Sequence, residues 1–66
     1  MRIVLNGEAR EVADGTTLAG LLASLDLAGK RFAVEINEEL VPRSEHPAYR
    51  LQDADQVEIV QAIGGG

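Results

Sequence analysis

The residues best placed to do unusual chemistry end the sequence, where a hydrophobic segment runs into Gly64, Gly65 and Gly66. Glycine has no Cβ and loses the most entropy on ordering, so it suits threading through a narrow passage better than packing. The preceding residues, 56–63, are the most strand-like in the chain. This pattern indicates a stiff strand that presents a slim carboxylate. The alternative interpretation is an idle, frayed terminus or a cloning remnant.

The chemistry open to such a tail belongs to the carboxylate of Gly66. A carboxylate is a poor electrophile, because its charge repels nucleophiles and its oxygen is a bad leaving group. Activation as an acyl-adenylate by a partner enzyme would remove both obstacles, and the acyl group could then pass to an amine or to a sulfur nucleophile. We therefore expect Gly66 to be the reactive residue, with Gly64 and Gly65 threading into the partner's active site.

The sequence shows no catalytic constellation of its own. It has no cysteine and a single histidine, His46, so it can form neither a disulfide nor a paired-imidazole metal site. A lone histidine is expected to be a solvated loop residue. Ser24 and Ser44 have no identifiable base, and the acidic pairs fall in turns, where such residues are common. We predict that the chain is not an enzyme, has no catalytic or metal-binding residues, and binds no cofactor itself.

Composition restricts the class of protein further. A chain of 66 residues forms one domain, and its 45% hydrophobic content, nearly all aliphatic, predicts a compact core. A net charge of −5 and only two aromatic residues, Phe32 and Tyr49, argue against nucleic-acid binding. No apolar run could span a membrane, and Met1 leads directly into a predicted strand, so we expect no signal peptide. A cytoplasmic protein that is monomeric when free is the expectation.

Asn6-Gly7 separates two strand-like runs at residues 2–5 and 8–12, which predicts a β-hairpin, since a type I′ turn needs two positive φ angles. A two-residue loop would place Ile3 opposite Arg10.

A helix is predicted next, capped by Thr16 or Thr17 and stopped near Gly29. Its apolar stripe is formed by leucines at helical spacing, and these are interpreted as core: Leu18, Leu21, Leu22 and Leu25.

Three further strands are predicted in the second half of the chain. Residues 32–36 alternate with period two, residues 40–41 form a short strand that Pro42 confines to a sheet edge, and residues 44–50 are irregular. In the last strand, Val57 and Ile59 should point inward. Val60, Ala62 and Ile63 are predicted to form a partner-docking face beside the tail.

One helix with one apolar stripe can cover only one face of a sheet. The predicted fold class is therefore α+β, a β-grasp (ubiquitin-like) fold with a mixed four- to five-stranded sheet and one main helix packed on one face. We expect residues 1–62 to form this domain and residues 63–66 to form a flexible glycine tail.

The segments "AVEIN", "LVPR" and "QVEIVQAIGGG" resemble the ThiS family of ubiquitin-like sulfur carriers in thiamin biosynthesis. The resemblance covers the whole chain, although the family often ends in two glycines where this chain has three. It implies that a ThiF-like activating enzyme, using ATP and Mg²⁺, adenylates Gly66. A sulfur donor such as a cysteine desulfurase would then give a thiocarboxylate, which supplies sulfur to a ThiG-like thiazole synthase.

Three other functions share this fold and tail. The first is the small subunit of molybdopterin synthase, whose chains are usually longer. The second is a ubiquitin-like modifier that would link Gly66 to lysine, and the third is an interaction module with an idle tail. Fold alone does not separate them.

Overall fold

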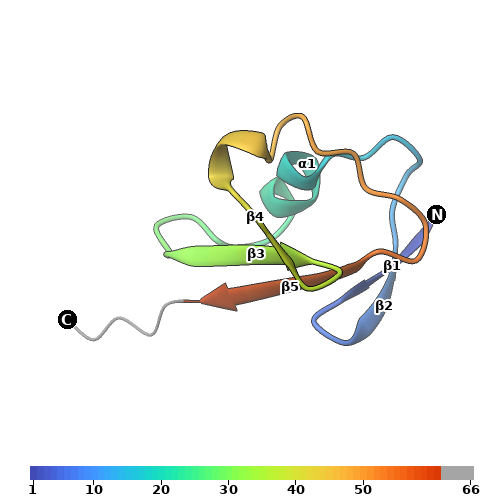
Figure 1. Ribbon diagram of the computed structural model, residues 1–66, viewed down its shortest axis with the longest axis horizontal. Helices are drawn as coiled ribbons and strands as arrows, with labels where there is room; N and C mark the ends of the chain where they lie inside the picture. Colours follow the sequence, from blue (N-terminus) through green and yellow to red (C-terminus); the bar gives the residue numbers. More distant parts are fainter. Residues whose placement is uncertain (62–66) are drawn as a thin grey trace.

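The computed structural model describes residues 1–61, so the predicted boundary between domain and tail lies outside the described part. Five strands form a single sheet of order β2-β1-β5-β3-β4, in which β1 and β5 are parallel and the other neighbours are antiparallel. The short helix α1 covers one face of this sheet (Figure 1). In chain order the elements are β1 (Arg2–Leu5), β2 (Glu8–Glu11), α1 (Leu18–Ala23), β3 (Phe32–Ile36), β4 (Glu39–Val41), the 3₁₀ helix η1 (Arg43–Glu45) and β5 (Gln56–Gln61).

The first hairpin has the predicted turn and register. Asn6 and Gly7 have φ angles of 49° and 84°, as a type I′ turn requires. Ile3 lies opposite Arg10, and Leu5 lies opposite Glu8. The hairpin therefore directs Ile3 and Leu5 into the core, while Arg10 stays exposed at the outermost strand.

Helix α1 begins as predicted but ends earlier. The Thr17 hydroxyl caps it by accepting a hydrogen bond from Gly20 N–H at 3.1 Å. The predicted stop at Gly29 is wrong, because α1 ends at Ala23. There the Ser24 side chain donates to the Leu21 carbonyl at 2.6 Å, and Ser24 N–H bonds the same carbonyl at 3.0 Å. Bonds of this short reach tighten the last turn and stop the α-helical pattern.

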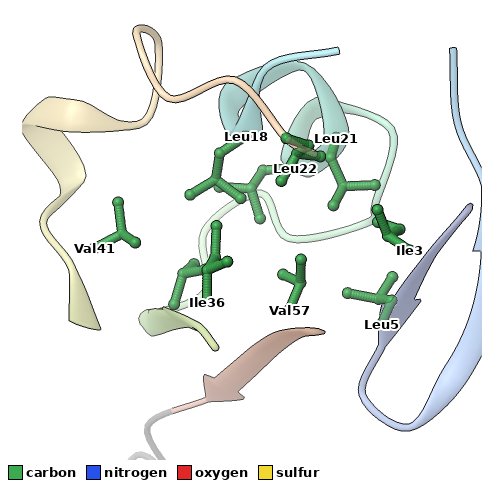
Figure 2. Packing of buried hydrophobic residues seen from close by; sticks show 10 residues of the cluster. Ile3, Leu5, Leu18, Leu21, Leu22, Ile36, Val41 and Val57 are labelled. Atoms are coloured by element: carbon green, nitrogen blue, oxygen red, sulfur yellow. The ribbon is translucent and has the colours of Figure 1, made fainter. Parts of the chain in front are cut away.

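The core lies between α1 and the inner face of the sheet. Figure 2 shows the three leucines of α1 above side chains that project from β1, β3 and β5. Four of the core side chains are completely or almost completely buried, which is the expected result of alternation along the strands. The buried residues are Ile3, Leu5, Leu18, Leu21, Leu22, Val34, Ile36, Val41, Leu51 and Val57.

The segment after β4 folds back over the start of α1. The His46 carbonyl accepts from Ala19 N–H at 3.0 Å, and the Tyr49 carbonyl accepts from Leu18 N–H at 2.8 Å. These bonds satisfy helix N–H groups that have no partner within the helix. The prediction of a solvated His46 is wrong: the residue is 7% exposed, and its Nε2 lies 3.0 Å from the Val41 carbonyl. The 3₁₀ turn of η1, in a region predicted to be irregular, brings the ring to this position.

Candidate functional site along strand β5

Of the residues predicted to form the site, Val60 is the one that the structure describes. Ala62, Ile63, Gly64, Gly65 and Gly66 lie outside the described residues. Val60 is on the outer face of β5, opposite Ala33 of β3, and its side chain is 51% exposed. The predicted outward direction of Val60 is thus confirmed, while its role in docking stays a prediction.

Strand β5 is held firmly at its start by the turn between β3 and β4. The Asn37 side-chain oxygen accepts from Gln56 N–H at 3.0 Å, and its amide nitrogen donates to Asp55 Oδ1 at 3.1 Å. The second Asp55 oxygen accepts from Gln52 N–H at 2.8 Å. Asp55 is only 8% exposed, so these bonds compensate for its removal from water. They fix the direction in which β5 leaves the turn.

The first hairpin holds the middle of β5 from the other side. Asn6 N–H donates to the Val57 carbonyl at 2.9 Å. The Asn6 side-chain oxygen accepts from Ile59 N–H at 2.8 Å. One turn residue therefore continues the β1–β5 ladder past the end of β1. The two asparagine turns together make β5 a rigid base for whatever follows Gln61.

The outer face of the sheet combines apolar and acidic side chains. Leu40 and Val60 are the large hydrophobic residues exposed among residues 1–61, at 65% and 51%. Between them, Glu35 of β3 lies directly opposite Glu58 of β5. Like charges placed opposite each other destabilise a sheet, so this pair is tolerated at a cost. A hollow of about 550 Å³ adjoins the pair, and its lining includes Glu38, Glu35 and Glu58.

Tyr49 is the residue of the described chain whose pKa is clearly shifted. Partial burial raises the pKa of Tyr49 above its ordinary value of 10.0, and the carboxylates of Asp55 and Glu39 raise it further. The Tyr49 side chain is partly buried and packs against the hydrophobic core.

Other kinds of site are not seen in the described part of the chain. Residues 1–61 contain no cluster of three or more His, Cys, Asp or Glu side chains that could hold a metal ion. Within the same residues, no helix has the length and apolar character needed to cross a membrane. The features that distinguish this surface are thus the strand β5, its acidic and apolar outer face, and the direction in which it ends.

Sequence patterns did not reveal the residues that position β5. The sequence pattern identifies Asn6 only as a turn residue and gives no role in the site to Asn37, although each also bonds the backbone of β5. Leu40 was expected to begin a strand, but its exposure was not anticipated. An asparagine at a turn is the one visible signal, and it does not identify the distant N–H that the side chain will bind.

Comparison with known proteins agrees with this architecture. The model of the ThiS family matches residues 3–66. The sulfur carrier protein ThiS of Escherichia coli is 38% identical over 66 residues, which cover 100% of both chains. The crystal structure of the thiamine biosynthesis protein ThiS from Geobacter metallireducens superimposes with a TM-score of 0.85 at 32% identity, covering 100% of each chain.

Longer relatives contain a similar segment. A thiazole synthase of Magnetococcus marinus is 48% identical over 66 residues, and one of Paramagnetospirillum magneticum is 41% identical over the same length. The chain covers 20% of each of these two relatives. The five-stranded sheet with one helix confirms the predicted β-grasp fold, and the family match confirms the resemblance seen in the sequence. This chain belongs to the ThiS family.

Proposed function

We propose that this chain is a sulfur carrier for thiazole formation in thiamin biosynthesis and is not itself an enzyme. The observation that carries the proposal is the extent of the family match, which runs from residue 3 through the glycine tail to residue 66. The Escherichia coli sulfur carrier aligns over the same full length. The two thiazole synthases that contain a similar segment favour the thiamin pathway over the molybdopterin alternative.

The proposed chemistry begins at the Gly66 carboxylate. One of its oxygens attacks the α-phosphorus of ATP on a partner activating enzyme, with Mg²⁺ on the nucleotide, and pyrophosphate leaves. A donor at the oxidation level of hydrosulfide then attacks the acyl carbon, and AMP leaves together with a proton. The product is a thiocarboxylate. Its sulfur is ionised at neutral pH and is a strong nucleophile, as other activated thiolates are, so it can be delivered to a thiazole synthase.

The chain's own contribution is to present the tail. Strand β5 is bonded along one side to β3, and its start and middle are fixed by Asn37 and Asn6. The side chain of Val60 faces outward near the end of the described strand. We assign docking to Val60 with Ala62 and Ile63, and passage through a narrow active site to Gly64 and Gly65, because glycine presents the slimmest backbone.

The test first measures the intact mass of the protein isolated from its own host. This mass checks that Gly66 carries the free carboxylate that the chemistry needs. The protein is then incubated with the activating enzyme encoded in the same genome, ATP and Mg²⁺. We expect pyrophosphate release and, with sodium sulfide as donor, a mass gain equal to the difference between sulfur and oxygen.

The matched control is the same chain with its Gly66 carboxylate converted to an amide. This change keeps every glycine and removes only the group to be adenylated. Amidation is expected to abolish sulfur loading without changing thermal unfolding, and normal loading of the amidated protein would contradict the proposal. A mass gain on partner lysines, equal to one copy of the chain less water, would instead identify a ubiquitin-like modifier.

A further inference from the structure

Strand β5 continues past the end of β1, and among residues 1–61 no strand lies beside the last part of its hydrogen-bonding edge. The last β1–β5 pair is Leu5 with Val57, whereas β5 extends to Gln61. On its other side, β5 stays paired with β3 as far as Phe32 opposite Gln61. The end of β5 therefore has one completed side and one open side.

The direction of the backbone groups follows from the ladder pattern. Asn37 N–H bonds the Gln56 carbonyl at 2.8 Å, so Gln56 turns its backbone groups toward the β3 side. In antiparallel pairing these directions alternate, and Val57, Ile59 and Gln61 therefore turn theirs toward the β1 side. Asn6 satisfies Ile59 N–H. Within residues 1–61, the Ile59 carbonyl and the Gln61 N–H then have no strand opposite them.

The two outer edges of the sheet carry the usual protection against pairing with another chain, and this inner edge does not. Strand β2 has the charged sequence EARE and is exposed throughout. Strand β4 is only 3 residues long and is followed by Pro42. Charge, shortness and proline are the devices that discourage edge pairing. The open part of β5, by contrast, carries Val60 and Gln61, which leave it suited to a partner strand.

The charges beside this edge indicate the chemistry of that partner. Glu58 is directly opposite Glu35, and both line the hollow of about 550 Å³ on the outer face, together with Asn6 and Gly7. Asn6 already occupies the position next to Glu58, so a strand along the open edge would begin level with Val60 and bring one outward side chain next to it. The end of that strand nearest Asn6 would lie beside the hollow that Glu58 lines. A lysine or arginine reaching into this hollow would offset the repulsion between the two carboxylates. An apolar residue would cover Val60.

We propose that an extended segment of the activating enzyme adds to β5 as a strand in the place that β1 leaves open, with an apolar side chain beside Val60 and a basic side chain that reaches past Asn6 into the hollow lined by Glu58 and Glu35. This inference rests on the proposed carrier function. Addition of a strand to a sheet edge supplies affinity through backbone bonds, and the alternating side chains supply specificity. Since β5 leads into the tail, the added strand also sets the direction in which the tail enters the enzyme.

Hydrogen–deuterium exchange of the full chain, followed by NMR, tests the edge directly. Addition of the activating enzyme is expected to slow exchange at Gln61 N–H by about tenfold or more. Ala9 N–H is the internal control. Met1 and Val12 exchange backbone hydrogen bonds. Bonded and non-bonded pairs alternate along an antiparallel ladder, so Ile3 and Arg10 form a bonded pair and the neighbouring pair, Val4 and Ala9, does not. The Ala9 N–H therefore points away from β1, out of the edge of the sheet. Its exchange rate is expected to stay unchanged.

Variants supply the second arm. Gln61→Pro removes the open N–H without breaking a bond to β3, and is expected to weaken binding at least about fivefold with the thermal midpoint preserved. Ala9→Pro, at a comparable outward-facing position, is the matched control for binding. Glu58→Lys is expected to weaken binding, whereas Glu45→Lys in η1 should not. If a proline variant does not fold, the exchange measurement decides alone.

The outcomes separate this inference from the proposed function. Pyrophosphate release together with unprotected Gln61 N–H in the complex would overturn the added strand and leave the carrier function standing. A complete lack of pyrophosphate release would overturn both. Protection at Gln61 with none at Ala9, and loss of affinity in Gln61→Pro alone, would support the strand.

Discussion

The side chain of Asn6 accepts a hydrogen bond at 2.8 Å from the backbone N–H of Ile59, 53 positions later in the chain. The same residue adopts a φ of 49° to form the first turn. One asparagine thus closes the hairpin and fastens the strand that carries the candidate site. Asn6 therefore has two roles, one through its backbone conformation and one through its side chain. A substitution that changes only the side chain tests the second role alone.

Asn6→Gly keeps the positive φ and removes the carboxamide. We expect a loss of about 1 kcal/mol in the free energy of unfolding, the usual net value of one hydrogen bond, measured by urea denaturation. Asn6→Asp, which retains an acceptor oxygen, is the comparison and should lose less. Wild-type stability in Asn6→Gly would show that the bond to Ile59 contributes nothing.

Leu22→Ala tests the core that supports β5. Leu22 is buried at 9% exposure, and its truncation is expected to cost about 2–5 kcal/mol in the free energy of unfolding. Such a loss is a large part of the stability of a small domain. The adjacent and exposed Ala23 provides the control, since Ala23→Ser should change denaturant unfolding little. Equal losses in the two variants would contradict the packing of α1 on the sheet.

His46→Ala should destabilise the protein although the residue belongs to a loop. The ring is buried and its Nε2 lies 3.0 Å from the Val41 carbonyl, so truncation removes this hydrogen bond. The lost bond costs about 1 kcal/mol, and the cavity left by the ring adds to this. Ser44→Ala, at an exposed neighbouring position, should leave the thermal midpoint unchanged. A His46→Ala variant as stable as Ser44→Ala would refute the role of the ring.

Tyr49 makes stability depend on pH in the alkaline range. Burial first, and then Asp55 and Glu39, raise the pKa of Tyr49 above 10.0 in the folded state. The folded protein therefore holds the phenolic proton more tightly than the unfolded chain. This contribution to stability is complete below about pH 10 and is lost as the pH rises through the folded pKa.

Tyr49 is the only tyrosine and tryptophan is absent, so absorbance titration reports its ionisation directly. The midpoint is expected above that of free tyrosine. The thermal midpoint of the wild type should fall more steeply above pH 10 than that of Tyr49→Phe, about the same pH range in which the phenol ionises. Parallel curves for the two proteins would contradict the shift.

Val60→Asp tests the docking face. Because Val60 is 51% exposed on the outer face, the substitution should leave thermal unfolding nearly unchanged. It is expected to weaken binding to the proposed activating enzyme, since it removes an apolar contact and would bury a carboxylate without a partner in the interface. Calorimetric titration measures the affinity. A folded Val60→Asp variant with wild-type affinity would remove Val60 from the docking face.

Much of the fold follows from local sequence patterns. Asn6-Gly7 fixes the turn, and with it the pairing of Ile3 and Arg10, because few turns of this length match the twist of two strands. The alternation over residues 32–36 agrees with the burial of Val34 and Ile36, and the leucine spacing correctly placed Leu18, Leu21 and Leu22 in the core. Leu25, predicted in the same stripe, lies beyond the end of α1 and is only partly buried against the core. In these segments the residues that determine the local structure lie within a few positions of one another in the sequence.

The errors and omissions arise where distant parts of the chain meet. His46 is buried because η1 and the segment after it fold back onto α1, through bonds that no local pattern shows. Helix α1 ends at Ala23 because the Ser24 side chain competes for a carbonyl that the hydrophobic pattern does not register. Asn37 and Asn6 reach β5 from turns far away in sequence. The docking face and the reactive tail were derived from composition and chemistry, and they stay predictions.

The central place of β5 has a consequence for how the protein is made. Because β5 lies between β1 and β3, the hairpin of β1 and β2 is not joined to the hairpin of β3 and β4 until β5 is added. During translation, residues 1–55 can form only separate hairpins and a short helix, since β1 meets its parallel neighbour across almost the whole chain. The ribosome must release β5 before the domain can close. A folded copy of the domain is therefore one whose synthesis has reached at least the end of β5.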